Sequence, residues 1–280
     1  MTGLDEALLR DSFKAQMPGQ SESCNFDVFT ELPSTNRFLM DHVRSHPDKA
    51  AQLRVCATAV QTAGVGRRGS DWVSGPECIT FSILQVLPIG PAQIAGLSLV
   101  TGLAIADALQ PLCDEQLQLK WPNDLMVGPA KLCGVLTELP KLNDQQVTVV
   151  TGIGVNYRHD SHHQQLERPY TTLLDLAADM KQGEATMLAA REELIGRIAA
   201  SVVQAHGQFA SKGWQHFSVA FEARDYLKGK SVRIEQGNEF IFGIARGVDA
   251  SGALELAVDG EIRSFAAGEV TIGHHGLMEN

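Results

Sequence analysis

Two arginines stand between three glycines at positions 64–69, which read G-V-G-R-R-G. Arg67 and Arg68 can each present several hydrogen-bond donors to a phosphate or a carboxylate. Glycines leave the backbone free to bend but make it costly to order. This composition predicts a loop that closes over an anionic ligand, and a solvated turn with two surface arginines is the alternative.

The same letters also match G-x-G-x-x-G, the turn that binds dinucleotides. That motif requires a strand before it and a helix that opens within it. A strand is expected at 53–61, but Gly75 and Pro76 follow too soon for a helix to propagate. The acidic residue expected about twenty residues further on is missing. The surroundings therefore exclude a nicotinamide-binding turn.

Two further motifs carry polar residues at the ends of predicted strands. The stretch K-W-P-N-D (120–124) ends a strand in a turn, and Lys131 then begins the next strand. The stretch G-I-G-V-N (152–156) ends an apolar strand, where glycine permits close approach of a ligand. Taken singly, each has an ordinary structural explanation: a turn, an exposed strand end and a β-bulge.

The elements that must position these residues follow from hydrophobic patterning. Strands are predicted at 53–61, 79–87, 117–121, 131–139 and 146–157, and the short links between the last three favour antiparallel pairing. Ser34 or Thr35 can cap a short helix. A buried helix is expected from Pro91 through 109, and a long helix from about 185 to 209. After 226, short strands alternate with Gly, Asn and Asp turns, which indicates a small β-barrel.

These patterns divide the chain of 280 residues into a loosely ordered arm (1–25), a main α+β domain (26–226) and the small barrel (227–280). The net charge of −10 disfavours nucleic acid, because a phosphate backbone needs a local basic patch. Five cysteines without C-x-x-C spacing indicate a reducing, cytoplasmic setting. We expect no signal peptide and no membrane span.

Taken together, these residues resemble the biotin–protein ligases. The resemblance runs from Ser34 to about Ile272 and rests on the motifs Ser34-Thr35-Asn36, Gln61 with Gly64–Gly69 and Trp72, Lys120–Asp124, Lys131-Leu132-Cys133-Gly134 with Leu136 and Glu138, and Gly152–Asn156. It implies a mixed, largely antiparallel sheet with helices packed on it, followed by an SH3-like barrel. It also implies activation of biotin by ATP as biotinyl-5′-AMP and transfer to one lysine of a biotin carboxyl carrier domain of a biotin-dependent carboxylase.

The resemblance implies roles for individual residues as well. Lys131, Arg67 and Asp124 would be catalytic. The biotin-binding residues would be Ser34, Thr35, Asn36, Gln61, Gly64, Gly134, Leu136, Gly152 and Gly154. The residues that bind ATP and the adenylate would be Arg67, Arg68, Trp72, Asn123, Lys131 and Asn156. Mg²⁺ is expected on the ATP phosphates without direct protein ligands.

The chain also departs from the family pattern. Val65 stands where many relatives carry a further arginine, so adenylate retention is expected to be weaker. The His159, His162 and His163 stretch has no implied role. Ser34 comes too early for a preceding helix-turn-helix domain, so no repressor function is expected. A lipoate–protein ligase and a non-catalytic biotin-binding module remain alternatives, and the chain is expected to be a monomer or a homodimer.

Overall fold

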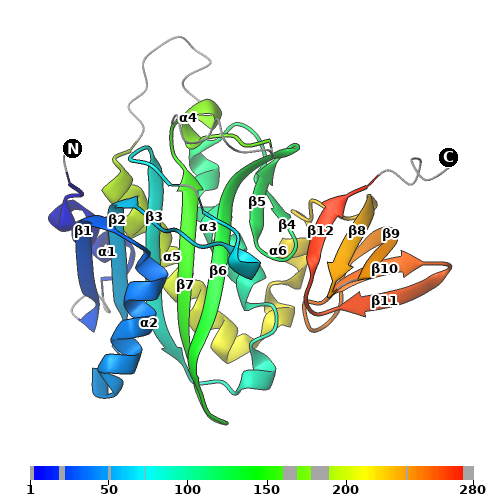
Figure 1. Cartoon of the computed structure of the whole chain (residues 1–280), viewed down its shortest axis with the longest axis horizontal. Helices are drawn as coiled ribbons and strands as arrows, with labels where there is room; N and C mark the ends of the chain where they lie inside the picture. Colours follow the sequence, from blue (N-terminus) through cyan, green and yellow to red (C-terminus); the bar gives the residue numbers. More distant parts are fainter. Residues whose placement is uncertain are drawn as a thin grey trace.

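The computed structural model describes residues 3–18, 23–49, 52–72, 74–159, 169–177, 189–237 and 239–273. Within these ranges a seven-stranded sheet and a five-stranded sheet lie side by side (Figure 1). No helix in the described ranges is long and apolar enough to cross a membrane.

The larger sheet has the strand order β1-β2-β3-β7-β6-β5-β4. Its strands are β1 (Asn25–Leu32), β2 (Arg54–Gln61), β3 (Cys78–Leu87), β4 (Gln118–Lys120), β5 (Asp124–Val127), β6 (Ala130–Leu142) and β7 (Val147–Asn156). Strand β1 runs parallel to β2, and the other neighbours pair antiparallel. The mixed, largely antiparallel sheet predicted from the sequence is therefore confirmed, although β1 and β5 were missed. Because β5 lies between β4 and β6, these two strands do not pair across the short link as predicted.

Helices cover both faces of this sheet (Figure 1). The helices are α1 (Glu6–Gln16), α2 (Thr35–Ser45), α3 (Leu97–Leu109), α4 (Leu173–Leu176), α5 (Arg191–Lys212) and α6 (Ser218–Glu222). Helices α1, α3 and α5 contribute to one large core together with Val55, Phe81 and Ile83. Helix α2 packs Leu39 and Val43 on the opposite face, against residues such as Leu84 of β3. This second face is only partly covered, which leaves room for a pocket beside α2.

The N-terminal segment is not the loosely ordered arm that we predicted for residues 1–25. Residues 6–16 form α1, whose N-terminus is capped by the Asp5 side chain. Leu9 and Phe13 are fully buried, because residues four apart share one face of a helix. Gly196 of α5 lets the helices approach closely, since a Cβ there would lie 2.5 Å from the Leu9 carbonyl oxygen.

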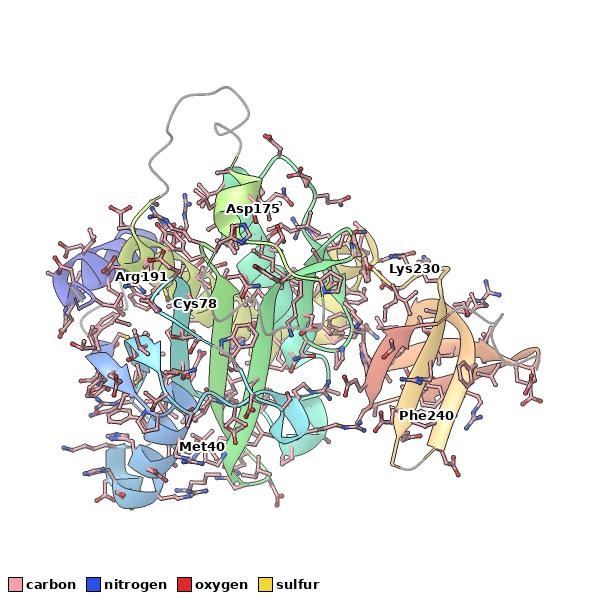
Figure 2. All side chains as sticks on the ribbon, turned by 45° about the horizontal axis from the view of Figure 1, so that its top comes forward. Met40, Cys78, Asp175, Arg191, Lys230 and Phe240 are labelled. Atoms are coloured by element: carbon pink, nitrogen blue, oxygen red, sulfur yellow. The ribbon has the colours of Figure 1, made fainter. Side chains whose placement is uncertain are left out.

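Two predicted helix starts were also wrong. Pro91–Gln93 form only a 3₁₀ turn, and α3 starts at Leu97, because Gly96 adopts a left-handed conformation with φ of 86° that interrupts a helix. The long helix begins at Arg191, later than predicted. The Arg191 guanidinium donates hydrogen bonds to the carbonyl groups of Pro76 and Cys78, which ties the start of α5 to the start of β3 (Figure 2).

The smaller sheet, here called the C-terminal sheet, has the order β11-β10-β9-β8-β12 with antiparallel pairing. Its strands are β8 (Ser231–Gln236), β9 (Glu239–Val248), β10 (Leu254–Val258), β11 (Glu261–Phe265) and β12 (Glu269–Ile272). Indole N–H groups join it to the main part: Trp121 donates to the Gly252 carbonyl at 3.1 Å and Trp214 donates to the Asp249 carbonyl at 3.2 Å. Two hydrogen bonds therefore join the segment between β9 and β10 to the main part of the chain.

Candidate active site

A cavity of about 360 Å³ lies beside α2, between the larger sheet and the C-terminal sheet. This size is typical of a small-molecule site. The predicted residues that line it are Ser34, Thr35, Asn36, Gln61, Arg67, Arg68, Trp72, Asn123, Asp124, Lys131, Gly134, Leu136, Gly152, Gly154 and Asn156. Gly64 lies behind this lining, where its carbonyl accepts a hydrogen bond from the Trp72 amide at 3.0 Å. The structure thus brings together residues spread over positions 34–156 of the chain.

One end of the cavity is neutral, polar and buried. Ser34 caps α2, which places Thr35 and Asn36 in the first helical turn. The Thr35 amide donates to Gln61 Oε1 at 2.9 Å, and Thr35 Oγ1 lies 2.7 Å from Ser82 Oγ. Ser82 Oγ in turn donates to Asn36 Oδ1 at 2.5 Å. We call Thr35, Asn36, Gln61 and Ser82 the neutral end.

The strand glycines in the middle of the cavity make room for protein side chains. A Cβ on Gly154 would lie 2.3 Å from the Trp72 ring, and a Cβ on Gly134 would lie 3.0 Å from it. A Cβ on Gly152 would lie 2.3 Å from Asn36 Oδ1. Gly134 and Gly154 are register partners across β6 and β7, so together they form a flat seat for the indole. Whether they also contact biotin, as the resemblance implies, stays a prediction.

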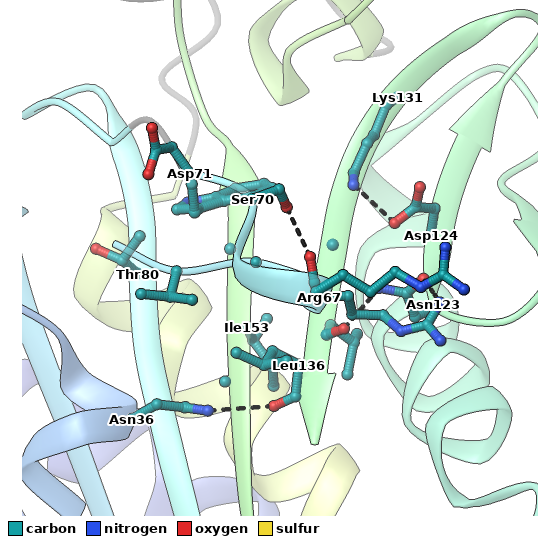
Figure 3. Close-up of a pocket in the computed structure, with 18 of the residues that line it drawn as sticks. Asn36, Arg67, Ser70, Asp71, Thr80, Asn123, Asp124, Lys131, Leu136 and Ile153 are labelled. Carbon is teal, nitrogen blue, oxygen red and sulfur yellow. Dashed lines mark hydrogen bonds and ion pairs between the residues drawn. The ribbon is translucent and has the colours of Figure 1, made fainter. Parts of the chain in front are cut away.

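The opposite end of the cavity is charged (Figure 3). Lys131 Nζ lies 2.7 Å from Asp124 Oδ1, and Nζ is 5.5 Å from the centre of the Trp72 ring. Arg67 Nη1 donates to Asn123 Oδ1 at 3.5 Å. We call Lys131, Asp124, Arg67 and Asn123 the charged end. Burial lowers the pKa of Arg67 from its usual value, while the nearby Asp124 carboxylate opposes this shift.

Local backbone contacts fix these charged side chains. Two hydrogen bonds join Asn123 to Val135. Asn123 Nδ2 donates to the Val135 carbonyl at 2.7 Å, and the Val135 amide donates to the Asn123 carbonyl at 3.0 Å. Asn156 Nδ2 donates to the carbonyls of Lys131 at 3.1 Å and Thr171 at 3.2 Å. In this structure the Asn156 amide group therefore positions Lys131, and its predicted contact with nucleotide stays a prediction.

The glycine–arginine loop is a closed hairpin above the charged end. Its backbone bonds join Gly66 N to the Ser70 carbonyl at 2.6 Å and Ser70 N to the Arg67 carbonyl at 3.1 Å. Val65 pairs with Asp71 as an isolated bridge, and its side chain is exposed. Residues 67–69 form a 3₁₀ turn, so the helix required by a dinucleotide motif is not present. The structure agrees with the exclusion of that motif.

The sequence reasoning missed several residues at the site. Ser82 is fully buried inside an apolar strand, and a polar residue on a buried face was the available signal. Tyr170 and Glu269 also line the cavity. Glu269 comes from the C-terminal sheet, and nothing in the local sequence could place it there.

Of the histidine stretch, only His159 lies within the described residues, where it makes two side-chain contacts. His159 Nε2 lies 2.8 Å from Asp175 Oδ1, and His159 Nδ1 lies 3.2 Å from the Tyr170 hydroxyl. His162 and His163 lie outside the described residues. Within the described ranges, no three His, Cys, Asp or Glu side chains form a metal-binding group.

Comparison with known proteins gives the same picture of both sheets. Residues 28–156 match the Biotin/lipoate A/B protein ligase family, and residues 228–273 match the Biotin protein ligase C terminal domain. The biotin protein ligase from Aquifex aeolicus, solved in complex with biotin and ATP, superposes with a TM-score of 0.71 at 23% identity, over 90% of this chain and 100% of that chain. This likeness supports the fold.

Two sequence relatives have a higher sequence identity to this chain than the Aquifex aeolicus structure has. The bifunctional ligase/repressor BirA of Salmonella typhimurium is 32% identical over 259 residues, which cover 90% of this chain and 76% of the relative. The biotin–[acetyl-CoA-carboxylase] ligase of Mycobacterium tuberculosis is 32% identical over 277 residues, which cover 95% of each protein. With these matches and the site geometry above, the chain belongs to the biotin protein ligase family.

Proposed function

We propose that this protein activates biotin with ATP and transfers it to one lysine of a biotin carboxyl carrier domain. The observation that carries the proposal is the polarity of the cavity. Its neutral end offers hydroxyl and amide groups, which suit the uncharged ureido ring of biotin. Its charged end offers Lys131 and Arg67, which suit a carboxylate and a phosphate that must approach one another.

In the first step, a carboxylate oxygen of biotin attacks the α-phosphorus of ATP. A new bond forms between this oxygen and the α-phosphorus as the bond from phosphorus to pyrophosphate breaks. Lys131 neutralises both anions by turning from Asp124 to the phosphate oxygens, and Arg67 exchanges Asn123 for a phosphate. Mg²⁺ on the triphosphate of ATP would offset part of its negative charge, beside the charges that Lys131 and Arg67 supply.

In the second step, the amine of the acceptor lysine attacks the acyl carbon, and AMP leaves. A lysine ammonium has a free pKa of about 10.4 and must lose a proton before it attacks. Once Lys131 turns to phosphate, the Asp124 carboxylate is free to receive and orient this ammonium. The hairpin loop excludes water, which protects the mixed anhydride until the acceptor arrives.

The neutral end favours biotin over lipoate. A dithiolane ring presents no strong donor or acceptor, so it would gain no hydrogen bonds from the hydroxyl and amide groups of the neutral end, each of which is worth about 0.5–1.5 kcal/mol. Asn36 Nδ2 also donates to Glu138 Oε2 at 2.8 Å, which fixes the orientation of the amide. The net charge of −10 supports the further proposal that nucleic acid is not a partner.

A transfer assay tests the proposal. The protein is incubated with biotin, ATP, Mg²⁺ and a carrier domain, and mass spectrometry is expected to show one biotin on one lysine. Lipoate in place of biotin is the matched comparison. Transfer of lipoate without transfer of biotin would assign the other substrate, and tight biotin binding without any transfer would identify a binding module.

A further inference from the structure

Arg67 and Arg68 of the glycine–arginine loop both contact the C-terminal sheet as well as lining the cavity beside the larger sheet. Arg68 Nη1 lies 3.2 Å from Glu235 Oε1, and Arg68 Nη2 donates to the Glu235 carbonyl at 3.2 Å. Arg67 Nη1 donates to the Gly268 carbonyl at 3.3 Å. One guanidinium therefore contacts a side chain and the backbone of the same residue, a two-point contact with a defined direction.

The two acceptors belong to one rigid edge of the C-terminal sheet. Glu235 of β8 pairs with Glu269 of β12, and Gly268 immediately precedes Glu269. Strands β8 and β12 are the part of this sheet that faces the larger sheet (Figure 1). The C-terminal sheet is also joined to the main part of the chain by the Trp121 contact with Gly252, between β9 and β10. The arginines thus contact a fixed support.

The loop has little other support at its tip. Arg68 adopts a left-handed backbone with φ of 54° and ψ of 26°, which is unfavourable for a residue with a Cβ. A Cβ added to Gly69 would find no atom within 4 Å, so the tip projects into open space. Ser70 and Asp71 are exposed. The hairpin's own backbone bonds keep its shape, and the contacts made by the arginines attach its tip to the C-terminal sheet.

The side chains of the two neighbouring arginines contact different parts of the structure. Arg67 is held between Asn123 of the charged end and the Gly268 carbonyl, so it can turn to a phosphate in the cavity. The Arg68 guanidinium lies against Glu235, 40% exposed in its side chain. A ligand that recruits Arg67 leaves the contact between Arg68 and Glu235 intact.

We propose that Glu235 is a positioning residue that latches the loop over the cavity through Arg68 and so retains the acyl-adenylate. This inference rests on the proposed function. The contact is a partly exposed ion pair, which is individually weak and screened by salt. A weak latch suits a lid that opens in every catalytic cycle, because a strong one would slow the entry of ATP and of the acceptor lysine.

The latch is tested first without any ligand. Hydrogen exchange of the backbone amides in residues 64–72 reports opening of the hairpin. Glu235→Gln removes the charge and keeps the shape, and it is expected to speed this exchange about two- to fivefold. Glu239→Gln is the matched control, because Glu239 is an exposed carboxylate in the same β-hairpin. Arg68→Gln also removes the contact with the Glu235 carbonyl, so it is expected to speed exchange at least as much as Glu235→Gln, and the double variant Arg68→Gln/Glu235→Gln is expected to match Arg68→Gln.

The same variants are then assayed with biotin, ATP and Mg²⁺. Adenylate that escapes labels lysines of a bystander protein, by attack of the amine on the acyl carbon with release of AMP. Glu235→Gln is expected to raise bystander labelling about two- to fivefold, with kcat for a saturating carrier domain unchanged. Glu239→Gln should label like the parent protein. Raising the salt concentration should raise labelling by the parent toward the Glu235→Gln level.

Equal hydrogen exchange in Glu235→Gln and Glu239→Gln would overturn the latch. Faster exchange without greater escape of adenylate would overturn its role in retention. A fall in kcat together with the melting temperature would also overturn it, since that pattern indicates a general structural role. Failure of the parent protein to form biotinyl-5′-AMP would instead reject the proposed function, and the exchange experiment would still stand on its own.

Discussion

The two ends of the cavity are built in opposite ways. The neutral end is a buried chain of hydroxyl and amide groups, in which Ser82 is fully buried and Thr35 and Asn36 are almost so. The charged end is half open, with Lys131 26% and Asp124 14% exposed in their side chains. Buried neutral groups are fixed and select by shape and hydrogen bonding. Accessible charges can exchange partners, which suits groups that must follow a moving phosphate.

Removal of the Lys131 charge from the charged end should have the largest effect on activity. Lys131→Ala is expected to lower the rate of adenylate formation about 10²–10³-fold, because one preorganised cation is lost and Asp124 is left to repel phosphate. Biotin affinity should change little. Single-turnover formation of biotinyl-5′-AMP measures the first quantity and calorimetry the second. Lys141→Ala, on an exposed part of β6, is the control. Adenylate formation at the parental rate would contradict the assigned role of Lys131.

A change between the two ends should come next. Gly154→Ala places a Cβ 2.3 Å from the Trp72 ring, so the indole must leave its seat. Overpacking of this kind costs about 1–3 kcal/mol, which corresponds to roughly 5- to 150-fold weaker binding of ATP. Trp72 fluorescence and the KM for ATP measure the change. Gly207→Ala in α5 is the control, because a Cβ there meets nothing within 4 Å. Unchanged fluorescence would show that the Trp72 indole does not leave its position beside residue 154 in the variant.

A change at the neutral end should have a smaller effect, confined to biotin. Ser82→Ala leaves Asn36 Oδ1 without its donor at 2.5 Å and removes the 2.7 Å contact of Thr35 Oγ1, which keeps its hydrogen bond to Gln61 Oε1. Buried groups left without hydrogen bonds cost about 1–2 kcal/mol, or roughly 5- to 30-fold in biotin affinity. The KM for ATP should remain at the parental value. An equal rise in the Kd for biotin and in the KM for ATP would show that the two ends of the cavity are not independent.

The smallest effect on activity at neutral pH should come from the core beneath the sheet. His206 is buried and bonded to Thr101 Oγ1 at 2.9 Å, and burial lowers its pKa from 6.5 to about 4. The unfolded chain takes up the proton first as the pH falls. Stability is therefore present above pH 6.5 and is lost progressively down to about pH 4, by about 3 kcal/mol for this one group.

Urea unfolding at pH 7 and pH 4.5 measures this loss. His206→Gln should be less acid-sensitive than the parent, although the variant starts from a lower stability because the imidazole contact with Gln85 is lost. His216→Gln is the control, because His216 is exposed. An unchanged acid sensitivity in His206→Gln would show that other groups cause it.

Much of the site could be predicted from short motifs. Most residues of G-V-G-R-R-G, K-W-P-N-D and G-I-G-V-N line one cavity, because each motif is local and its chemistry is carried by its own residues. Local patterning also predicted strands β3, β6 and β7, and the short link between β6 and β7 predicted their antiparallel pairing. The N-terminal segment was misjudged for the opposite reason. Its helix α1 is stabilised by burial of Leu9 and Phe13 against α5, a partner that is distant in sequence.

The sequence by itself determined which chemical groups this protein has: a lysine, an aspartate and two arginines beside glycines, in an order typical of biotin protein ligases. Only the tertiary structure decided how those groups divide their work. It paired Lys131 with Asp124, seated Trp72 on Gly154, and turned Arg68 away from the catalytic sheet onto Glu235. The physical reason is that hydrogen bonds and ion pairs depend on distances of a few ångströms between residues far apart in the chain. No local pattern of letters contains those distances.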